Sequence, residues 1–201
     1  MVRIFYMNWI LLNTSEVVDG CARLTDGRAK HIIKVLRAEV GKKLRVGLLD
    51  GPFGTATVVE VSSEHVLLDC VFEAARPARP KIDLLLAMPR PKVLKRLWSQ
   101  FAALGVGRII ITNAEKVERY YFDTHILTPE FYTPRLVEGL QQAGDTRLPA
   151  VEIVRNLQSF LGEEPFADVG HRLLADPSGT QSVQDCLTDI PVVEGAASRV
   201  L

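Results

Sequence analysis

The sequence has no long hydrophobic run and few cysteines. Its longest apolar stretches, such as Ile82–Met88 and Val106–Ile111, fall well short of the roughly 20 apolar residues that a membrane-spanning helix needs. The three cysteines, Cys21, Cys70 and Cys186, have neither the spacing of a metal site nor that of a redox pair. We therefore expect a cytoplasmic protein with reduced thiols that does not enter a membrane.

The common motifs of nucleotide-binding and hydrolytic sites are also missing. The sequence contains no G-x-G-x-x-G, no P-loop and no G-x-S-x-G. Its four histidines lie far apart and lack metal-ligand spacing; they are His31, His65, His125 and His171. No metal site is expected, and the motifs assign no catalytic residue.

Charge is balanced overall but unevenly distributed. The formal net charge of the 201 residues is zero, yet Cys21–Gly47 holds eight Lys or Arg against two Asp or Glu. Arg76–Gln100 holds seven against one, whereas Phe160–Leu201 holds two against seven. This asymmetry favours a basic surface for nucleic acid and a separate acidic region. An ordinary solvated surface is the alternative, and charge alone does not decide between the two.

The first 75 residues have the pattern of a small β-barrel with one helix. Short apolar or alternating stretches are separated by turn residues at the spacing of an all-β module. Thr25-Asp26 is a suitable helix cap, and Gly41 follows the expected end of that helix. The predicted strands are Val2–Leu12, Leu44–Leu49, Thr55–Val61 and His65–Phe72, and the predicted helix is Gly27–Glu39.

A proline-containing linker, residues 74–80, precedes a different pattern in the second part of the chain. Strands and helices alternate there, which is typical of an α/β domain with a parallel sheet. We predict a barrel domain over residues 1–75 and an α/β domain over residues 80–201. The strands predicted in the second domain are Ile82–Met88, Arg108–Thr112, Val151–Val154 and Arg172–Ala175; the helices are Lys92–Leu104, Pro134–Ala143 and Leu157–Gly162.

The helix predicted over Gly27–Glu39 carries an unusual set of cations. Lys30, Lys34 and Arg37 have the i, i+4, i+7 spacing of one helix face, where like charges repel and do not stabilise the helix. This pattern suits contacts with the phosphates of RNA, although a solvated surface helix remains an alternative. His31 beside these residues is either a further RNA contact or a structural histidine.

A second basic cluster contains Arg90, Lys92, Lys95 and Arg96. It follows the predicted strand Ile82–Met88, at the kind of strand end where open α/β sheets bind ligands. The alternative is the charged outer face of an amphipathic helix.

Residues 30–51, KHIIKVLRAEVGKKLRVGLLDG, resemble the N-terminal module of the bacterial 16S ribosomal RNA (uracil-N3) methyltransferases of the SPOUT superfamily. In that family a His-Ile-x-x-Val-Leu-Arg stretch is followed by a Gly and by an Asp-Gly turn, which correspond here to residues 31–37, Gly41 and Asp50-Gly51. The family's Pro-Lys pair, its Leu-Gly-Val helix end and its Gln-rich stretch follow in the same order, at residues 91–92, 104–106 and 141–149.

The resemblance implies an α/β fold with a PUA-like barrel and a SPOUT-type methyltransferase domain. It also implies S-adenosylmethionine as methyl donor, small-subunit ribosomal RNA as partner, uridine N3 as the methylated atom, and a homodimer. The RNA-binding residues expected from the basic clusters are Arg23, Arg28, Lys30, His31, Lys34, Arg37, Arg90 and Lys92. The donor-binding residues expected by resemblance are Leu174, Ala175, Asp176 and Pro177, although Asp-Pro is also an ordinary turn.

The chain also differs from the family pattern. Phe101 stands where the family has a Lys, and Asp145 stands where it has an Arg, with Arg147 two residues later. The family's Gly-Pro-Glu-Gly-Gly loop and its later Leu-Gly-x-x-x-Leu-Arg-x-Glu-Thr stretch are not found, so we expect the knot segment to follow Leu201. Three interpretations stay open: an rRNA methyltransferase that lacks its main donor loops, a non-catalytic RNA-binding relative, or an unrelated α/β enzyme.

Overall fold

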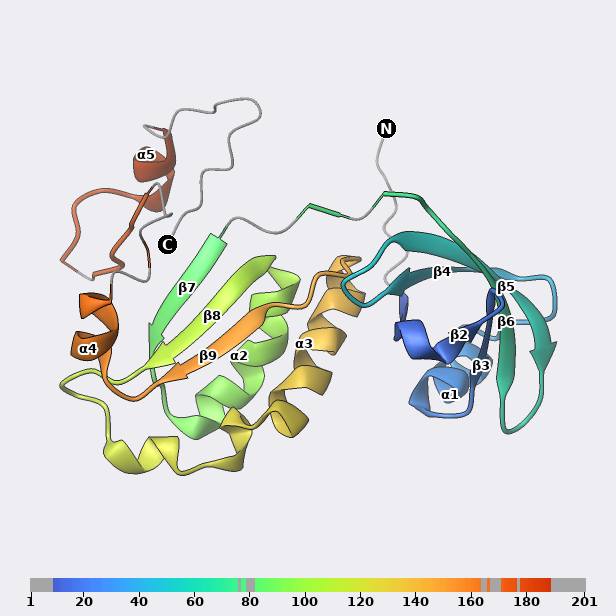
Figure 1. Ribbon diagram of the computed structural model, residues 1–201, viewed down its shortest axis with the longest axis horizontal. Helices are drawn as coiled ribbons and strands as arrows, with labels where there is room; N and C mark the ends of the chain where they lie inside the picture. The colour runs from blue at the N-terminus through green and yellow to red at the C-terminus, as the bar shows by residue number, and fades with distance from the viewer. Residues whose placement is uncertain are drawn as a thin grey trace.

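A computed structural model describes residues 9–75, 77–78, 82–163, 166, 171–176 and 178–188. These residues form two separate sheets that lie side by side (Figure 1). The first sheet has six strands and the second has three, with helices against both. Among the described helices, none is both long and apolar enough to span a membrane.

The N-terminal sheet is curled and has the strand order β1-β4-β5-β6-β3-β2. β1 pairs with β4 in parallel, and the other neighbouring strands are antiparallel. This arrangement confirms the predicted barrel-like module. The strands are β1 (Ile10–Leu12), β2 (Val17–Val18), β3 (Cys21–Leu24), β4 (Lys43–Leu48), β5 (Phe53–Val61) and β6 (Val66–Phe72).

The sequence prediction missed part of this sheet. β2 and β3 were not predicted because two to four residues are too few to show a clear alternation. The 3-10 helix η1 (Thr14–Glu16) before them was missed for the same reason. β1 begins at Ile10, whereas the predicted strand began at Val2, and residues 1–8 of that prediction lie outside the described residues.

Helix α1 (Gly27–Lys34) covers the curled sheet with its apolar side, on which Ala29 and Ile32 are buried. The helix ends at Lys34 and not at the predicted Glu39. Beyond its end the chain turns so that Ala38 is buried, and Arg37 takes a left-handed conformation with φ of +45°. The prediction that Lys30, Lys34 and Arg37 share one helix face is therefore wrong, because Arg37 lies past the helix.

The start of α1 is held by an ion-pair cluster around Arg28. The Asp26 side chain accepts a hydrogen bond from the Arg28 backbone N–H at 2.8 Å, as the predicted helix cap should. The guanidinium group of Arg28 pairs with both Asp26 and Glu16, and its Nη1 also donates to the Leu11 carbonyl oxygen at 2.8 Å. All of the guanidinium nitrogens are thereby engaged within the protein.

These contacts shift the acid–base behaviour of the cluster. Hydrogen bonds from Arg28 lower the pKa of Glu16 and the pKa of Asp26, while burial opposes both shifts. The same hydrogen bonds raise the pKa of Arg28. The cluster thus holds one positive and two negative charges near neutral pH.

The second sheet is parallel and has the order β7-β8-β9, which confirms the predicted α/β architecture. Helices α2 and α3 cover one face of this sheet (Figure 1). The elements of this part are β7 (Ile82–Ala87), α2 (Pro91–Ala103), β8 (Val106–Thr112), η2 (Arg119–Phe122), η3 (His125–Leu127), α3 (Pro129–Ala143), β9 (Ala150–Val154), α4 (Leu157–Gly162) and α5 (Val183–Thr188).

Apolar side chains on both faces of β8 form the centre of this layer. Ile109 and Ile111 pack with Trp98 of α2 and Leu136 of α3 in one buried cluster. Ile110 faces the other way and is covered by Phe160 and Phe166. Burial on both faces explains why the centre of β8 is the apolar run Ile109–Ile111.

Two predictions for the second part were wrong. α3 begins at Pro129 and contains Pro134 in its interior, whereas the prediction began the helix at Pro134. Proline also occupies the first turn at Pro129, a position where the missing N–H is tolerated. The predicted strand Arg172–Ala175 is not formed: the described residues 172–176 belong to no strand, and all of them are exposed. α5 was not predicted.

The two sheets are joined through Thr146, which is fully buried. The Thr146 hydroxyl donates to the Gly51 carbonyl oxygen at 2.7 Å, and the Asp50 N–H donates to the Thr146 carbonyl oxygen at 2.7 Å. The Leu148 N–H donates to the Asp50 carboxylate at 3.2 Å. The Gln-rich stretch singled out in the sequence therefore leads directly into the junction between the two parts.

Close packing of α2 and α3 gives a test of this fold. A Cβ atom added at Gly139 would overlap the Ser99 carbonyl oxygen and lie 3.0 Å from the Ala102 Cβ. We expect Gly139→Ala to lower the free energy of unfolding by about 2 kcal/mol, despite alanine's higher helix propensity. Gly27→Ala is the control, because nothing lies within 4 Å of its added Cβ. Chemical denaturation of both variants measures the difference, and equal stabilities would contradict the packing argument.

The Arg28 cluster predicts a specific pH dependence. We expect Arg28→Met to lower the free energy of unfolding by about 2 kcal/mol at neutral pH, because two carboxylates lose their charged partner. A carboxyl group with a lowered pKa stabilises the fold above its unfolded-state pKa, and this contribution disappears as pH falls through the folded-state value. The difference between wild type and Arg28→Met should therefore shrink in acid. Arg96→Met on the exposed side of α2 serves as control, and a pH-independent difference would refute the role of the cluster.

Candidate functional site

Exposed cations surround α1 on the N-terminal module. Lys30 and Lys34 lie on the helix, Arg37 follows its end, and Arg23 lies on β3. The side chains of all four are exposed. Such long cationic side chains on one module are well suited to contacting the phosphates of a nucleic acid.

Arg28 differs from these four cations. Its side chain is 21% exposed, and its guanidinium lies in the cluster with Glu16 and Asp26. The two carboxylates neutralise its charge, so Arg28 holds the start of α1 in place. A basic residue in a basic segment of the sequence can therefore stabilise the fold and take no part in ligand binding, as Arg28 does.

Arg90 and Lys92 lie at the start of α2, just after β7. Arg90 is the residue that precedes the first turn, Pro91 occupies the first helical position, and both cations are exposed. The predicted placement of this cluster between a strand end and a helix start is confirmed. Phe101, which replaces the family's usual Lys, is buried in the core between α2 and the sheet.

A groove separates α1 from α3 and has a volume of about 280 Å³. We call it the interhelix groove. His31 lies in its wall, so the structure brings this predicted residue together with side chains of the second part of the chain. The lining residues are Trp9, Ile10, Gly27, Arg28, His31, Glu138, Gln141 and Gln142.

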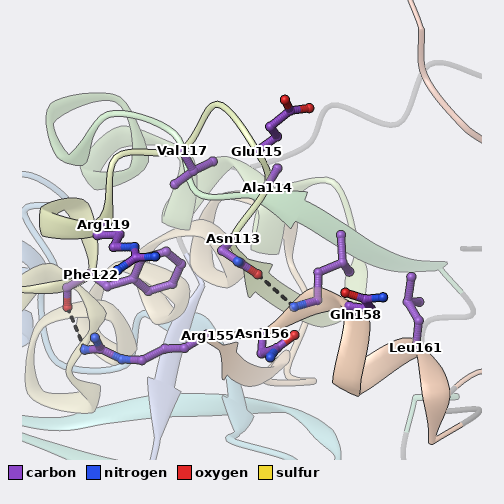
Figure 2. A pocket seen from close by; sticks show the side chains of 11 residues that line it. Asn113, Ala114, Glu115, Val117, Arg119, Phe122, Arg155, Asn156, Gln158 and Leu161 are labelled. Atoms are coloured by element: carbon purple, nitrogen blue, oxygen red, sulfur yellow. Dashed lines mark hydrogen bonds between the residues drawn. The ribbon is translucent and has the colours of Figure 1, made fainter.

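A larger pocket of about 790 Å³ lies where β8 and β9 end (Figure 2). We call it the carboxyl-edge pocket, because open parallel sheets bind ligands beyond the carboxyl ends of their strands. Arg119 and Arg155 supply positive charge, and Phe122 supplies an aromatic ring. The full lining is Asn113, Ala114, Glu115, Val117, Arg119, Phe122, Arg155, Asn156, Leu157, Gln158 and Leu161.

Hydrogen bonds fix the walls of the carboxyl-edge pocket. The Asn113 side-chain oxygen Oδ1 accepts a hydrogen bond from the Leu157 N–H at 2.7 Å, which ties the loop after β8 to α4 (Figure 2). Arg155 donates to the Phe122 carbonyl oxygen at 3.2 Å, and its guanidinium lies 5.5 Å from the Phe122 ring centre. The pocket therefore has a preformed shape with two exposed guanidinium groups, a combination suited to an anionic, partly aromatic ligand.

The carboxyl-edge pocket could not be predicted from the sequence. Its residues come from two loops, η2 and α4, and they have no motif spacing. The available signal was indirect: Asn113 and Arg155 each follow a predicted parallel strand, at the edge where such sheets bind ligands.

The expected donor-binding residues lie in an exposed segment. Leu174 is 90% exposed, and Ala175 and Asp176 are exposed as well. The Asp176 carboxylate accepts hydrogen bonds from the backbone N–H and the hydroxyl of Ser178, and these bonds lower the pKa of Asp176. Pro177 lies outside the described residues. The described part of this segment does not by itself enclose a small molecule.

Comparison with known families matches both parts of the chain. An RNA methyltransferase PUA domain matches residues 24–69, and an RNA methyltransferase domain matches residues 76–200. The second match covers more than half of the chain and includes the three parallel strands and the helices around them.

Two curated relatives are small-subunit ribosomal RNA methyltransferases. The chain is 30% identical over 182 residues to ribosomal RNA small subunit methyltransferase E of Treponema pallidum (strain Nichols), covering 87% of this chain and 68% of the relative. It is 28% identical over 156 residues to ribosomal RNA small subunit methyltransferase E 1 of Borreliella burgdorferi, covering 77% of this chain and 65% of the relative.

A solved structure supports the fold. Ribosomal RNA small subunit methyltransferase E from Neisseria gonorrhoeae, bound to S-adenosyl methionine, superposes with a TM-score of 0.63 at 16% identity. The match covers 97% of this chain and 78% of that one. With a PUA-type module, a parallel α/β layer and matches in the same order along the sequence, the chain belongs to the RNA methyltransferase family that includes the small-subunit methyltransferases E.

Proposed function

We propose that this protein takes part in methylation of small-subunit ribosomal RNA with S-adenosylmethionine as methyl donor, and that the methylated atom is N3 of a uridine. The observation that carries the proposal is the family match across both parts of the chain, including 30% identity to a small-subunit methyltransferase. Uridine N3 comes from the resemblance of residues 30–51 to the uracil-N3 enzymes.

The N-terminal module is proposed to hold the RNA backbone. Lys30, Lys34 and Arg37 are exposed in and just after α1, and Arg23 is exposed on β3. Contacts of this kind position RNA without reading its sequence and make binding depend on salt. Arg90 and Lys92 extend the proposed RNA contacts to the α/β layer. Arg28 is left out of the proposed contacts because its charge is neutralised by Glu16 and Asp26.

The carboxyl-edge pocket is proposed to face the nucleotide that is modified. Its two exposed arginines can pair with the phosphates that flank this nucleotide, and its amide groups can hydrogen-bond a base edge. A preformed pocket at the end of parallel strands is the default location for chemistry in such a sheet.

S-adenosylmethionine would supply an electrophilic methyl group to the RNA base. The described residues expected beside it, Leu174, Ala175 and Asp176, are exposed and form no cradle for an adenosyl group. The roles proposed for this chain's residues therefore concern the RNA. A cytoplasmic homodimer is part of the proposal, as the family resemblance implies.

Salt dependence of RNA binding tests the basic helix. We expect Lys30→Gln and Lys34→Gln each to weaken binding of a small-subunit rRNA transcript and to reduce the slope of log affinity against log salt by about 1, because each removes one phosphate contact. Fluorescence anisotropy across a salt series measures both quantities. Lys43→Gln is the matched control, since this exposed lysine lies on β4 and not on α1. Salt-independent binding, or equal effects of all three changes, would contradict the proposal.

Methyl transfer tests the activity itself. We expect the protein to transfer labelled methyl groups from S-adenosylmethionine to small-subunit rRNA or subunits that lack the modification, and mass spectrometry of the nucleosides to identify N3-methyluridine. Arg119→Gln should reduce this incorporation, because the pocket loses a phosphate partner. RNA binding without any methyl transfer would favour a non-catalytic RNA-binding protein, and methylation at another atom would refute the uridine N3 assignment.

A further inference from the structure

We propose that the interhelix groove binds one unpaired base of the RNA and thereby gives the complex sequence selectivity. This inference rests on the proposed function, because it requires RNA on the basic helix. Nothing in the roles assigned above uses the groove, although its walls contain His31 and the Gln-rich stretch that the sequence analysis singled out.

The chemistry of the groove fits a base better than a phosphate. On α3, Glu138, Gln141 and Gln142 have the i, i+3, i+4 spacing of one helix face and supply carboxylate and amide groups. Glutamine both donates and accepts hydrogen bonds, as the edge of a nucleobase does. The Glu138 carboxylate would repel a phosphate.

Arg28 is the one permanent cation among the described residues of the groove wall, and its side chain is already engaged. The Arg28 guanidinium pairs with Glu16 and Asp26 and donates to the Leu11 carbonyl oxygen. Its donors are therefore directed into the protein, away from a ligand in the groove. Among the described lining residues, Gln141 and Gln142 offer both hydrogen-bond donors and acceptors to a ligand, and Glu138 adds a negative charge.

The groove lies beside the proposed path of the RNA backbone. On α1, His31 lines the groove, and Lys30 and Lys34 lie one residue before it and three residues after it on the same short helix. An RNA backbone held by the two lysines would pass along the rim of the interhelix groove. An unstacked base can turn from this backbone into the groove. A volume of about 280 Å³ admits a single base but not a double helix. Sequence-specific RNA recognition usually reads such splayed bases.

Rigid packing holds the two walls at a fixed separation. The Trp9 ring forms part of the groove and packs against Phe53, with ring centres 4.9 Å apart. Gly144, just after the two glutamines, leaves no room for a side chain, because an added Cβ would lie 2.7 Å from the Trp9 Nε1. The groove is thus preformed, which lowers the entropic cost of binding a base.

Glutamine truncation combined with abasic RNA tests the proposal. The probes are a small-subunit rRNA transcript, short single-stranded homopolymers of each of the four nucleotides, and the same lengths of abasic RNA. We expect Gln141→Ala and Gln142→Ala to weaken binding of the transcript and of the preferred homopolymer by roughly three- to tenfold. The slope of log affinity against log salt concentration should stay unchanged, and the affinity for abasic RNA should not change. Gln100→Ala on α2 is the matched control, an exposed glutamine on a neighbouring helix.

Each outcome has a defined meaning. A loss confined to RNA that carries bases supports the groove as a base site, and a loss of preference among the four homopolymers supports it further. Unchanged affinity in both glutamine variants, or an equal loss on abasic RNA, overturns the inference while the basic helix and the methyl transfer stand. If the wild-type protein binds no RNA, the proposed function fails and the groove proposal fails with it.

Discussion

The junction at Thr146 is the constraint on which the rest of the arrangement depends. One buried threonine exchanges hydrogen bonds with the turn at Asp50-Gly51, so the loop after α3 is fixed against the loop between β4 and β5. Asp50 has a left-handed φ of +54°, a conformation that aspartate tolerates, and its N–H donates to the Thr146 carbonyl oxygen. Arg147 adds a bond of 2.8 Å to the Pro77 carbonyl oxygen in the linker. Leu11 of β1 adds to this junction, because its side chain is buried in the core formed by α2, α3 and β8. These contacts hold the two parts against each other, and the shape of the interhelix groove depends on them.

Local periodicity explains what the sequence could predict. β4, β5 and β6 alternate with period two, α2 has a clear apolar stripe, and β8 is a short apolar run, so all of these were predicted to within a few residues. The end of α1 could not be predicted in this way, because the burial of Ala38 against the barrel core, and not helix propensity, decides where the helix stops. In the segment 172–176 a strand was predicted where none forms. Apolar residues there gave the pattern of a strand, but the segment is exposed.

The functional surfaces also differ in how far local sequence could predict them. The basic residues around α1 were predictable because charge is visible in the sequence and neighbouring helical positions stay close in space. The ion pair between Arg28 and Glu16 was not predictable, because Glu16 lies in a 3-10 helix that the pattern did not reveal. The interhelix groove and the carboxyl-edge pocket both require residues that are distant in the chain, and only the folded structure brings these together.

Arg37 carries a consequence for the balance between stability and binding. A non-glycine residue with φ of +45° has a crowded Cβ atom, which costs folding roughly 1 to 2 kcal/mol relative to a relaxed backbone. The exposed guanidinium is thus displayed at a strained position, on the tight bend that leads the chain from α1 back into the barrel. Glycine would relieve the strain and remove the charge in a single change. Fold stability alone would favour glycine at this position, whereas an exposed positive charge requires arginine. Stability and charge therefore make opposite demands on the residue at this bend.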